Sequence, residues 1–510
     1  MSEIVIIGGG IAGLASAALL ARAGHEVTLL EKRDELGGRV GVWNEDGFRF
    51  DTGPSWYLMP EVFDHFFRLL GTTAEEQLSL ITLDPGYRVY FEGDPEPVDI
   101  SASREENLDV FEGLEDGAGF RLHDYLESAS QTYDLAKRKF LYTTFADIRP
   151  VFTSEVVGQG RRFLTLMTQP LSRFIAKRFK DRRLRQILGY PAVFLGSSPH
   201  ATPSMYHLMS HLDLDQGVQY PMGGFSTVVQ SIAKLAREHG VTIITDADVR
   251  RIVVEHGAAT GVEYRGAKGE VLFADADIVV SAADLHFTET RLLEAAQQTF
   301  PQKYWDARVA SPGAVLIHLG VDGALPELEH HTMLFTAKWE QGFKALLGGE
   351  APIPASLYVC KPSGVDPSVA PEGSENLFVL VPVPADPEFG RGGDDRIEQL
   401  ADAVIQQIAD WTGVADLAGR ITVRRTVGPG DFAADLNAWR GSALGPAHTL
   451  KQSAFFRAGN VSKKVSGLYY VGASTIPGIG LPMCLISAEL LVKRLRGDVS
   501  TKPLREPLKP

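Results

Sequence analysis

Cysteine is scarce in this chain of 510 residues, which contains only Cys360 and Cys484. The two are far apart and in no metal-binding spacing, so they predict neither a disulfide framework nor a zinc site, and they fit a reducing compartment. Basic charge is also in deficit, because the formal net charge is −14. This balance argues against nucleic acid as the main partner.

Long apolar runs are absent as well. No stretch of about 18 apolar residues occurs, so the sequence predicts no transmembrane helix. The nearest candidate, residues 467–492, is interrupted by prolines and glycines. No basic segment precedes the first apolar run, so no signal peptide is expected. Hydrophobic residues still make up 44% of the chain, enough for two or more domains or for one domain with a large insertion.

The first forty residues have the pattern of a βαβ unit. Residues 4–7 predict a strand, residues 11–23 a helix of small side chains, and residues 26–31 a second strand. The turn between the first strand and the helix has the spacing G-x-G-x-x-G of dinucleotide-binding sites. A glycine-rich turn in an ordinary α/β domain is the alternative, and it leaves the acid after the second strand unexplained.

Each part of this unit would have a physical role in such a site. We expect Gly8 to permit the tight turn, Gly10 to let the backbone approach a pyrophosphate, and Gly13 to let helix and strand pack closely. The N–H groups at the helix start would bind phosphate, and Glu31 would accept from ribose hydroxyls. The candidate cofactor-binding residues of this unit are Gly8, Gly10, Ile11, Ala12, Gly13, Glu31 and Lys32.

Two further segments favour FAD over NAD as the dinucleotide. Gly37, Gly38 and Arg39 follow the ribose-binding acid, an arrangement typical of flavoproteins, in which the arginine helps to hold the phosphates. Residues 48–56 predict a strand that ends in a glycine-proline loop near the flavin ring. The candidate residues of these segments are Gly38, Arg39, Gly53, Pro54 and Ser55.

The end of the chain predicts a second helix N-terminus at the flavin. Residues 467–471 read as a strand, a glycine-proline loop follows, and a helix begins near Pro482 and continues to about Arg496. Such a helix would favour an anionic reduced flavin. Cys484 lies inside this helix, so we expect no covalent flavin link through it. The candidate residues here are Gly472, Gly480 and Met483.

The α/β pattern is interrupted twice. It stops near residue 80, returns at 220–284 with a helix over 227–238 and several strands, and departs again over 285–439. We prefer a discontinuous FAD-binding domain (1–80, 220–284 and 440–500), which includes Val249 as a candidate cofactor-binding residue. A free-standing α/β subdomain at 220–284 is the alternative. The substrate and membrane-docking domain would then be 81–219 and 285–439, with a flexible tail at 501–510.

The first interruption contains a strongly basic stretch. Residues 161–185 hold nine Lys or Arg against one acid, Asp181, and residues 172–188 have helical spacing with apolar side chains on one side. A basic amphipathic helix can lie on an anionic membrane surface. A solvated helix face with salt bridges explains the stretch equally well. In the second interruption, the adjacent His330 and His331 lack a carboxylate or third histidine at ligand spacing, so core or loop histidines are expected and no metal site is predicted.

Taken together, these segments resemble the carotenoid desaturases of the bacterial phytoene desaturase type, and the resemblance covers nearly the whole chain. The first motif alone would indicate only the superfamily of amine oxidases and related flavoproteins. The segments that carry the closer resemblance are Asp51–Ser55, Tyr220–Gly224, Ser281–His286, Ser356–Tyr358, Ala370–Gly373, Asn437–Ala443 and Tyr470–Pro482.

The resemblance implies an α/β fold: a two-dinucleotide-binding, Rossmann-like FAD domain with a discontinuous α+β substrate domain inserted. It also implies FAD without bound metal and a long isoprenoid hydrocarbon substrate, phytoene above all. Hydride would pass to flavin N5, with reoxidation by oxygen or a quinone. The location would be cytoplasmic and peripherally membrane-associated. Asp147 lies near where the family carries polar residues discussed as proton acceptors. A surface ion pair with Arg149 is the alternative.

Other functions remain open on the sequence alone. Carotenoid isomerases, ketolases and later-step dehydrogenases share these motifs, because substrate choice depends on channel residues that a sequence does not place. A non-catalytic isoprenoid carrier related to Rab-escort proteins is disfavoured by the intact C-terminal flavin loop. An amine oxidase would require an aromatic cage or a flavin-linking cysteine near that loop.

Overall fold

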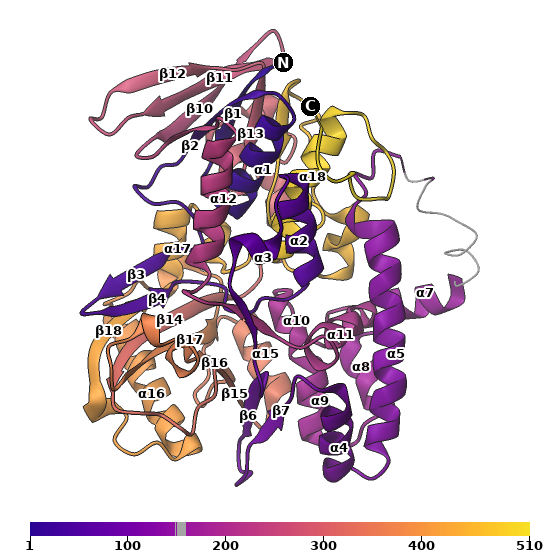
Figure 1. Cartoon of the computed structure of the whole chain (residues 1–510), viewed down its shortest axis with the longest axis vertical. Coiled ribbons are helices and arrows are strands. Elements are labelled where there is room, and N and C mark those ends of the chain that lie inside the picture. The colour runs from indigo at the N-terminus through magenta and orange to yellow at the C-terminus, as the bar shows by residue number, and fades with distance from the viewer. Residues whose placement is uncertain (148, 150–159, 510) are drawn as a thin grey trace.

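The structure is a computed structural model that describes residues 1–147, 149 and 160–509. Its upper half in Figure 1 is built around a five-stranded parallel sheet with the order β19-β13-β1-β2-β9. The chain supplies these strands from three distant segments. They are β1 (Glu3–Ile7), β2 (Glu26–Leu30), β9 (Thr242–Ile244), β13 (Ile278–Ser281) and β19 (Leu468–Tyr470). The βαβ unit predicted at the start of the chain is confirmed, with α1 at Ile11–Arg22.

Alternation along β1 directs its side chains into two different layers. Ile4 and Ile6 contact a helical layer made of α1, α2 (Pro60–Leu69), α12 (Ser226–Glu238) and α18 (Leu481–Leu495). Val5 and Ile7 face a three-stranded antiparallel sheet on the opposite side. That sheet consists of β10 (Asp248–Glu255), β11 (Ala258–Arg265) and β12 (Val271–Asp275). Both faces of the parallel sheet are therefore buried, as parallel sheets require.

A seven-stranded mixed sheet forms the lower left part of Figure 1. Its order is β18-β14-β17-β16-β15-β6-β7, and only the β15–β6 pair is parallel among the described residues. One face packs on α16 (Asp395–Thr412) in an apolar core. The strands are β6 (Tyr87–Phe91), β7 (Val98–Ile100), β14 (Gly313–Asp322), β15 (His331–Phe335), β16 (Leu357–Cys360), β17 (Ser374–Val383) and β18 (Ile421–Val427).

Helices that cover the lower right part of Figure 1 come from residues 104–214. They are α4 (Arg104–Leu114), α5 (Ala118–Ala136), α7 (Gly160–Thr168), α8 (Leu171–Ala176), α9 (Arg182–Gly189), α10 (Pro191–Phe194) and α11 (Met209–Leu214). The single helix predicted over 172–188 is wrong, because α8 and α9 are separate. The Asp181 carboxylate accepts from the Arg183 N–H and caps a new helix start.

The remaining elements are short. They are α3 (Ala74–Gln77), α13 (Leu285–Arg291), α14 (Gln302–Asp306), α15 (Trp339–Leu347) and α17 (Pro429–Leu436), with the strand pairs β3 (Val42–Glu45) and β4 (Phe48–Asp51), and β5 (Leu80–Thr82) and β8 (Gln219–Pro221).

The C-terminal tail differs from the flexible segment predicted for 501–510. Leu508 is buried in the helical-layer core, and its N–H donates to the Leu69 carbonyl at 2.9 Å. The buried Lys493 ammonium donates to the Lys502 carbonyl at 2.5 Å. The tail is held because it covers apolar surface of α2 and satisfies a buried cation, which its polar composition did not indicate.

Candidate functional site

A single large cavity of about 1050 Å³ runs between the parallel sheet and the seven-stranded sheet. Small-molecule sites span about 300–1,000 Å³, so this cavity lies at the upper end of that range. Of the sixteen residues predicted to bind the cofactor, all but Gly13 line the cavity. They are Gly8, Gly10, Ile11, Ala12, Glu31, Lys32, Gly38, Arg39, Gly53, Pro54, Ser55, Val249, Gly472, Gly480 and Met483.

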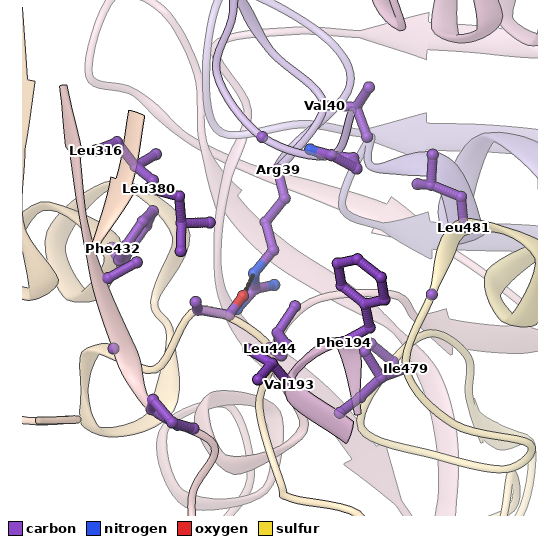
Figure 2. A pocket seen from close by; sticks show the side chains of 18 of the residues that line it. Arg39, Val40, Val193, Phe194, Leu316, Leu380, Phe432, Leu444, Ile479 and Leu481 are labelled. Atoms are coloured by element: carbon purple, nitrogen blue, oxygen red, sulfur yellow. Dashed lines mark hydrogen bonds between the residues drawn. The ribbon is translucent and has the colours of Figure 1, made fainter. Parts of the chain in front are cut away.

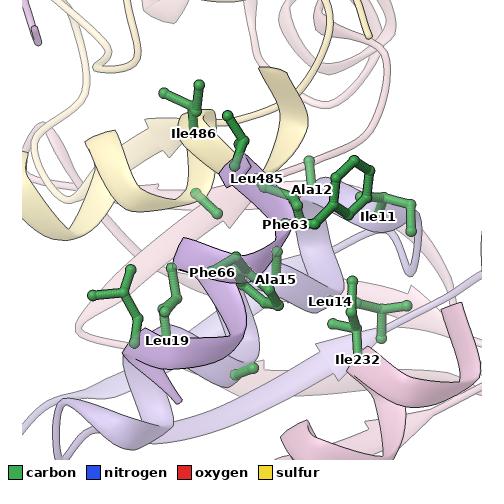
Figure 3. Close-up of a cluster of buried hydrophobic side chains, with 14 of the residues drawn as sticks. Ile11, Ala12, Leu14, Ala15, Leu19, Phe63, Phe66, Ile232, Leu485 and Ile486 are labelled. Atoms are coloured by element: carbon green, nitrogen blue, oxygen red, sulfur yellow. The ribbon is translucent and has the colours of Figure 1, made fainter. Parts of the chain in front are cut away.

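Gly13 lies beneath the cavity and lets α1 approach the first turn. A Cβ on this residue would lie 2.0 Å from the carbonyl oxygen of Gly8. Gly8 itself has φ +101°, a conformation that other residues rarely adopt. Figure 3 shows that a movement of α1 to relieve such a contact would disturb its packing, because α1 is enclosed by apolar side chains of α2, α12 and α18, among them Phe63, Ile232 and Ile486.

Two helix N-termini open onto the cavity. No side chain caps α1 after Gly10, or α18 after Gly480. Ile11 and Ala12 at the start of α1 and Met483 in the first turn of α18 all line the cavity. The unpaired N–H groups and positive dipole of each helix start favour an anion there.

Glu31 stands at the end of β2, where the dinucleotide turn meets the cavity. Its carboxylate accepts from the N–H of Gly9 at 2.6 Å and from the N–H of Arg33 at 3.0 Å. A carboxylate has about four acceptor positions, so about two remain for ribose hydroxyls.

Arg39 supplies a positive charge in the wall of the cavity. Its Nε donates to the Ala443 carbonyl at 2.8 Å, and within the described part of the chain it forms no ion pair. Desolvation lowers the pKa of Arg39, and the charge of Asp284 offsets only part of this effect. A desolvated guanidinium without an ionic partner fits a bound phosphate. The uncapped helix starts, the glycine turn and this cation thus fit a dinucleotide.

The other part of the cavity is apolar. Figure 2 shows Leu316, Leu380 and Phe432 on one side of Arg39, and Val193, Phe194 and Ile479 on the other. Leu316 and Leu380 project from the cavity-facing side of the seven-stranded sheet, whereas the alternate residues of β14 and β17 face α16. The side chains of α15 complete this wall at Trp339, Phe343 and Leu346.

The helix α15 was missed on the sequence, although it carries a readable signal. Trp339, Phe343 and Leu346 recur at i, i+4 and i+7, which is the spacing of an amphipathic helix. Lys338, Gln341 and Ile353 of the same segment are exposed to solvent and also line the cavity, so the cavity reaches the surface here.

Asp147 does not line the cavity, contrary to its predicted role as proton acceptor. The Arg149 guanidinium donates to both of its carboxylate oxygens, and this bonding holds the pKa of Asp147 below its usual range. The structure therefore shows the surface ion pair that was the alternative, because a solvated partner two residues away satisfies the carboxylate locally.

Comparison with known proteins assigns the family. The family model of flavin containing amine oxidoreductases matches residues 11–495. The chain belongs to this family. FAD is accordingly its cofactor, and the chain is an oxidoreductase with the α/β fold predicted from its sequence.

Curated relatives of this flavoprotein are similar over nearly their whole length. A carotenoid 3,4-desaturase of Haloarcula japonica is 40% identical over 499 residues, 98% of this chain and 99% of the relative. A zeta-carotene-forming phytoene desaturase of Myxococcus xanthus is 35% identical, covering 97% and 93%. A 4,4'-diapophytoene desaturase of Staphylococcus haemolyticus is 28% identical, covering 97% and 99%.

Solved structures share the fold of this flavoprotein at low identity. An oxidoreductase from Methanosarcina mazei has a TM-score of 0.63 at 18% identity, covering 96% of this chain and 100% of that one. A putrescine oxidase double mutant has a TM-score of 0.59 at 15% identity, covering 98% of each chain. Among the described residues, no helix is both long enough and apolar enough to cross a bilayer.

Proposed function

We propose that this flavoprotein desaturates a carotenoid-type isoprenoid hydrocarbon, introducing C=C bonds into phytoene on the way towards lycopene. The observation that carries this proposal is that the dinucleotide turn and a large set of apolar side chains line the same cavity. We call the part of the cavity between Leu316, Leu380 and α15 the apolar arm. The similarity to carotenoid and phytoene desaturases supports the same substrate class. A hydrocarbon offers no polar group, so an apolar arm must hold it by shape and burial.

The bound FAD would supply the hydride acceptor for an allylic C–H bond. The protein's own contribution is position and exclusion of water. The glycine turn and Arg39 hold the dinucleotide, and the sheet residues Leu316 and Leu380 fix the chain of the substrate beside it. Correct placement of reacting atoms supplies a large share of such a barrier reduction.

The proposed reaction assigns a role to each domain. We propose that 1–80, 220–284 and 440–500 bind FAD, and that 81–219 and 285–439 build the substrate arm. The fifteen cavity-lining candidates named above would contact the cofactor, and Gly13 would act by close packing.

Contact with a membrane is part of the proposal, but at a different surface from the basic stretch. The apolar side chains of α8 and α9 are buried in the core, so they are not free to enter a bilayer. Arg182 and Arg183 pair with Asp94 and Asp181, as expected for a solvated face. We propose that the α15 mouth meets the membrane, because Leu347 is 70% exposed and Ile353 46% exposed beside the opening of the cavity.

Liposome flotation tests this surface. Leu347→Glu is expected to reduce the fraction of protein that floats with anionic vesicles several-fold, because a charge at the contact must be desolvated. Val271→Glu is the matched control, since Val271 is equally exposed, at 73%, on the distant β12. Equal loss in both variants, or no loss in either, would contradict docking at α15.

Product analysis tests the reaction itself. Purified protein loaded with FAD is incubated with phytoene in liposomes, under air or anaerobically with a quinone, and the pigments are separated by HPLC. New carotenes with longer conjugation are expected, and the two conditions identify oxygen or a quinone as acceptor. Unchanged phytoene in both would refute the proposed substrate.

A later-step dehydrogenase is the second candidate. The 40% identity to a carotenoid 3,4-desaturase favours it specifically. Lycopene offered in the same liposomes separates the two, because only a later-step enzyme extends its conjugation. Flavin reduction by lycopene with none by phytoene would establish this second function.

A further inference from the structure

A chain of short hydrogen bonds leads from the cavity into the protein behind its wall. The Ser55 hydroxyl and the Tyr358 hydroxyl both line the cavity and lie 2.6 Å apart. The Tyr358 oxygen is also 2.6 Å from Nδ1 of His331, which is fully buried. The three side chains come from the loop after β4, from β16 and from β15, so the fold assembles the chain from distant segments.

The direction of these bonds follows from the hydrogens available. Tyr358 has one hydroxyl hydrogen. Burial lowers the pKa of His331 well below its usual value, so the ring is neutral and can present Nδ1 as an acceptor. Tyr358 then donates to His331 and accepts from Ser55. The Ser55 oxygen keeps acceptor capacity, and Ser55 lines the cavity.

The hydrogen-bond chain ends in a buried polar cluster whose ring nitrogens could form further hydrogen bonds. Nε2 of His331 and both ring nitrogens of His330 have no hydrogen-bond partner among the described residues. The two rings meet edge to face, with centroids 4.5 Å apart. The indole of Trp56, which lines the cavity, stacks on His331 at 4.3 Å and holds its ring in place.

Cys360 also lies in this cluster, directly across from His331 in the β15–β16 ladder. Burial raises the pKa of the Cys360 thiol to about 12, so it stays protonated and does not compete as a base. The charged groups that act on the cluster are Lys361 and Asp366, which act at His330, and Asp51, which acts at Cys360.

We propose that Ser55, Tyr358 and His331 form a proton relay that removes the proton lost from the substrate during desaturation. This inference rests on the proposed function. One C–H bond breaks with its electron pair, as hydride to FAD. The adjacent C–H bond leaves its pair behind as the new π bond, and its proton goes to the Ser55 oxygen. The Ser55 hydrogen moves to Tyr358, and the Tyr358 hydrogen moves to Nδ1 of His331.

The relay balances over a full cycle. After desaturation His331 is an imidazolium, and reoxidation by oxygen or a quinone consumes one hydride and one proton. The stored proton returns along the same three groups to meet that need. A weak base is sufficient, because a C–H bond beside a cationic carbon is a far stronger acid than an imidazolium.

The first test measures flavin reduction by the carotenoid substrate in anaerobic stopped flow, in H₂O and in D₂O. The wild type is expected to be about twofold slower in D₂O, because two exchangeable hydrogens, those of the Ser55 and Tyr358 hydroxyls, move in the relay. Tyr358→Phe is expected to reduce flavin about 10²-fold more slowly or worse, the scale of lost general base catalysis, and without the D₂O effect. Ser55→Ala should do the same, and Ser55→Thr should restore both properties.

Tyr90→Phe is the matched control, since Tyr90 lies in β6 of the same sheet and its hydroxyl donates to the Glu327 backbone carbonyl at 2.8 Å, but it lies outside the cavity. It should keep both rate and isotope effect. If Tyr358→Phe slows reduction but keeps the D₂O effect, the hydroxyl only positions the loop and the relay is refuted. A wild type without any D₂O effect refutes it as well.

The second test needs no turnover. In protein labelled with ¹⁵N-histidine, with His331 assigned by His331→Gln, we expect a neutral ring whose Nδ1 accepts a hydrogen bond. Tyr358→Phe should shift that resonance downfield, to the position of an unbonded pyridine-type nitrogen. A proton on Nδ1 in the wild type would overturn the relay, even if no carotenoid reduced the flavin and the proposed function failed.

Discussion

Replacing Gly13 with alanine tests how the start of α1 holds the cofactor. The new Cβ would lie 2.0 Å from the Gly8 carbonyl oxygen and 3.2 Å from the Cβ of Ala282, whereas contacts under 3.0 Å are essentially never seen. The start of α1 must therefore withdraw from the glycine turn by about 1 Å, against the packed neighbours of the helical layer.

The expected effect on FAD affinity follows from the bonds that this displacement breaks. The N–H groups of Ile11 and Ala12 open onto the cavity and would donate to phosphate oxygens. Hydrogen bonds to charged groups contribute about 1.5–3 kcal/mol each, so losing two costs about 3–6 kcal/mol. At about 1.4 kcal/mol per tenfold change, the Kd for FAD should rise by about 10²- to 10⁴-fold.

Titration of the apoprotein with FAD, followed by flavin fluorescence, measures this change. Gly113→Ala is the matched control, because Gly113 lies in α4 with no atom near its added Cβ. It should leave the Kd unchanged and stabilise the fold by about 0.5–1 kcal/mol. If Gly13→Ala has the unfolding midpoint of the wild type and a Kd for FAD within about threefold of the wild-type Kd, the phosphate role of this turn is refuted.

Three further results are expected. Burial holds the pKa of three histidines near 3 or 4, against about 6.5 in the unfolded chain. Below pH 6.5 the unfolded state therefore binds protons that the folded state does not, and each histidine should lower the free energy of unfolding by about 2 kcal/mol between pH 7 and pH 5. Urea unfolding at the two pH values measures this loss. The three histidines are His207, His318 and His330. Burial raises the pKa of Asp213 to about 7, so its contribution to stability is complete below about pH 4, and up to about 4 kcal/mol of it is lost as the pH rises to 7. Asp213→Asn should remove this part of the pH dependence of the free energy of unfolding. The same pH dependence in wild type and variant would contradict the prediction. Leu380→Trp should obstruct the apolar arm, with FAD binding kept and product formation reduced at least about tenfold by HPLC; full turnover would place the substrate elsewhere.

The cofactor half of the site was readable from the sequence because its determinants are local. The strand, glycine turn, helix and acid of residues 4–31 lie within one βαβ unit, and each piece has its own signature. The C-terminal loop was readable for the same reason, since Gly480 and Pro482 mark the start of α18. These segments line one cavity in the structure.

The helical region was less predictable, because local capping competes there with periodicity. Residues 172–188 have the spacing of one amphipathic helix, but Asp181 bonds to the backbone and starts a new one. The stretch was predicted to be either a membrane-surface helix or a solvated face with salt bridges. Its arginines do form ion pairs, and its apolar side packs on α4 and α5. Asp147 was chosen by position in the chain, which carries no information on whether a side chain reaches the cavity.

The apolar arm and the polar cluster behind it depend on the register of the seven-stranded sheet, which no local pattern specifies. β14 and most of β17 read as almost uniformly apolar, so alternation does not reveal which of their residues face the cavity. His331 meets Cys360 across the ladder, and Tyr358 points to the same face two residues earlier. A slip of one residue in this pairing would turn Tyr358 towards α16 and leave Ser55 without its partner. The proposed relay is therefore a property of strand register rather than of the His-His pair that first drew attention to this strand.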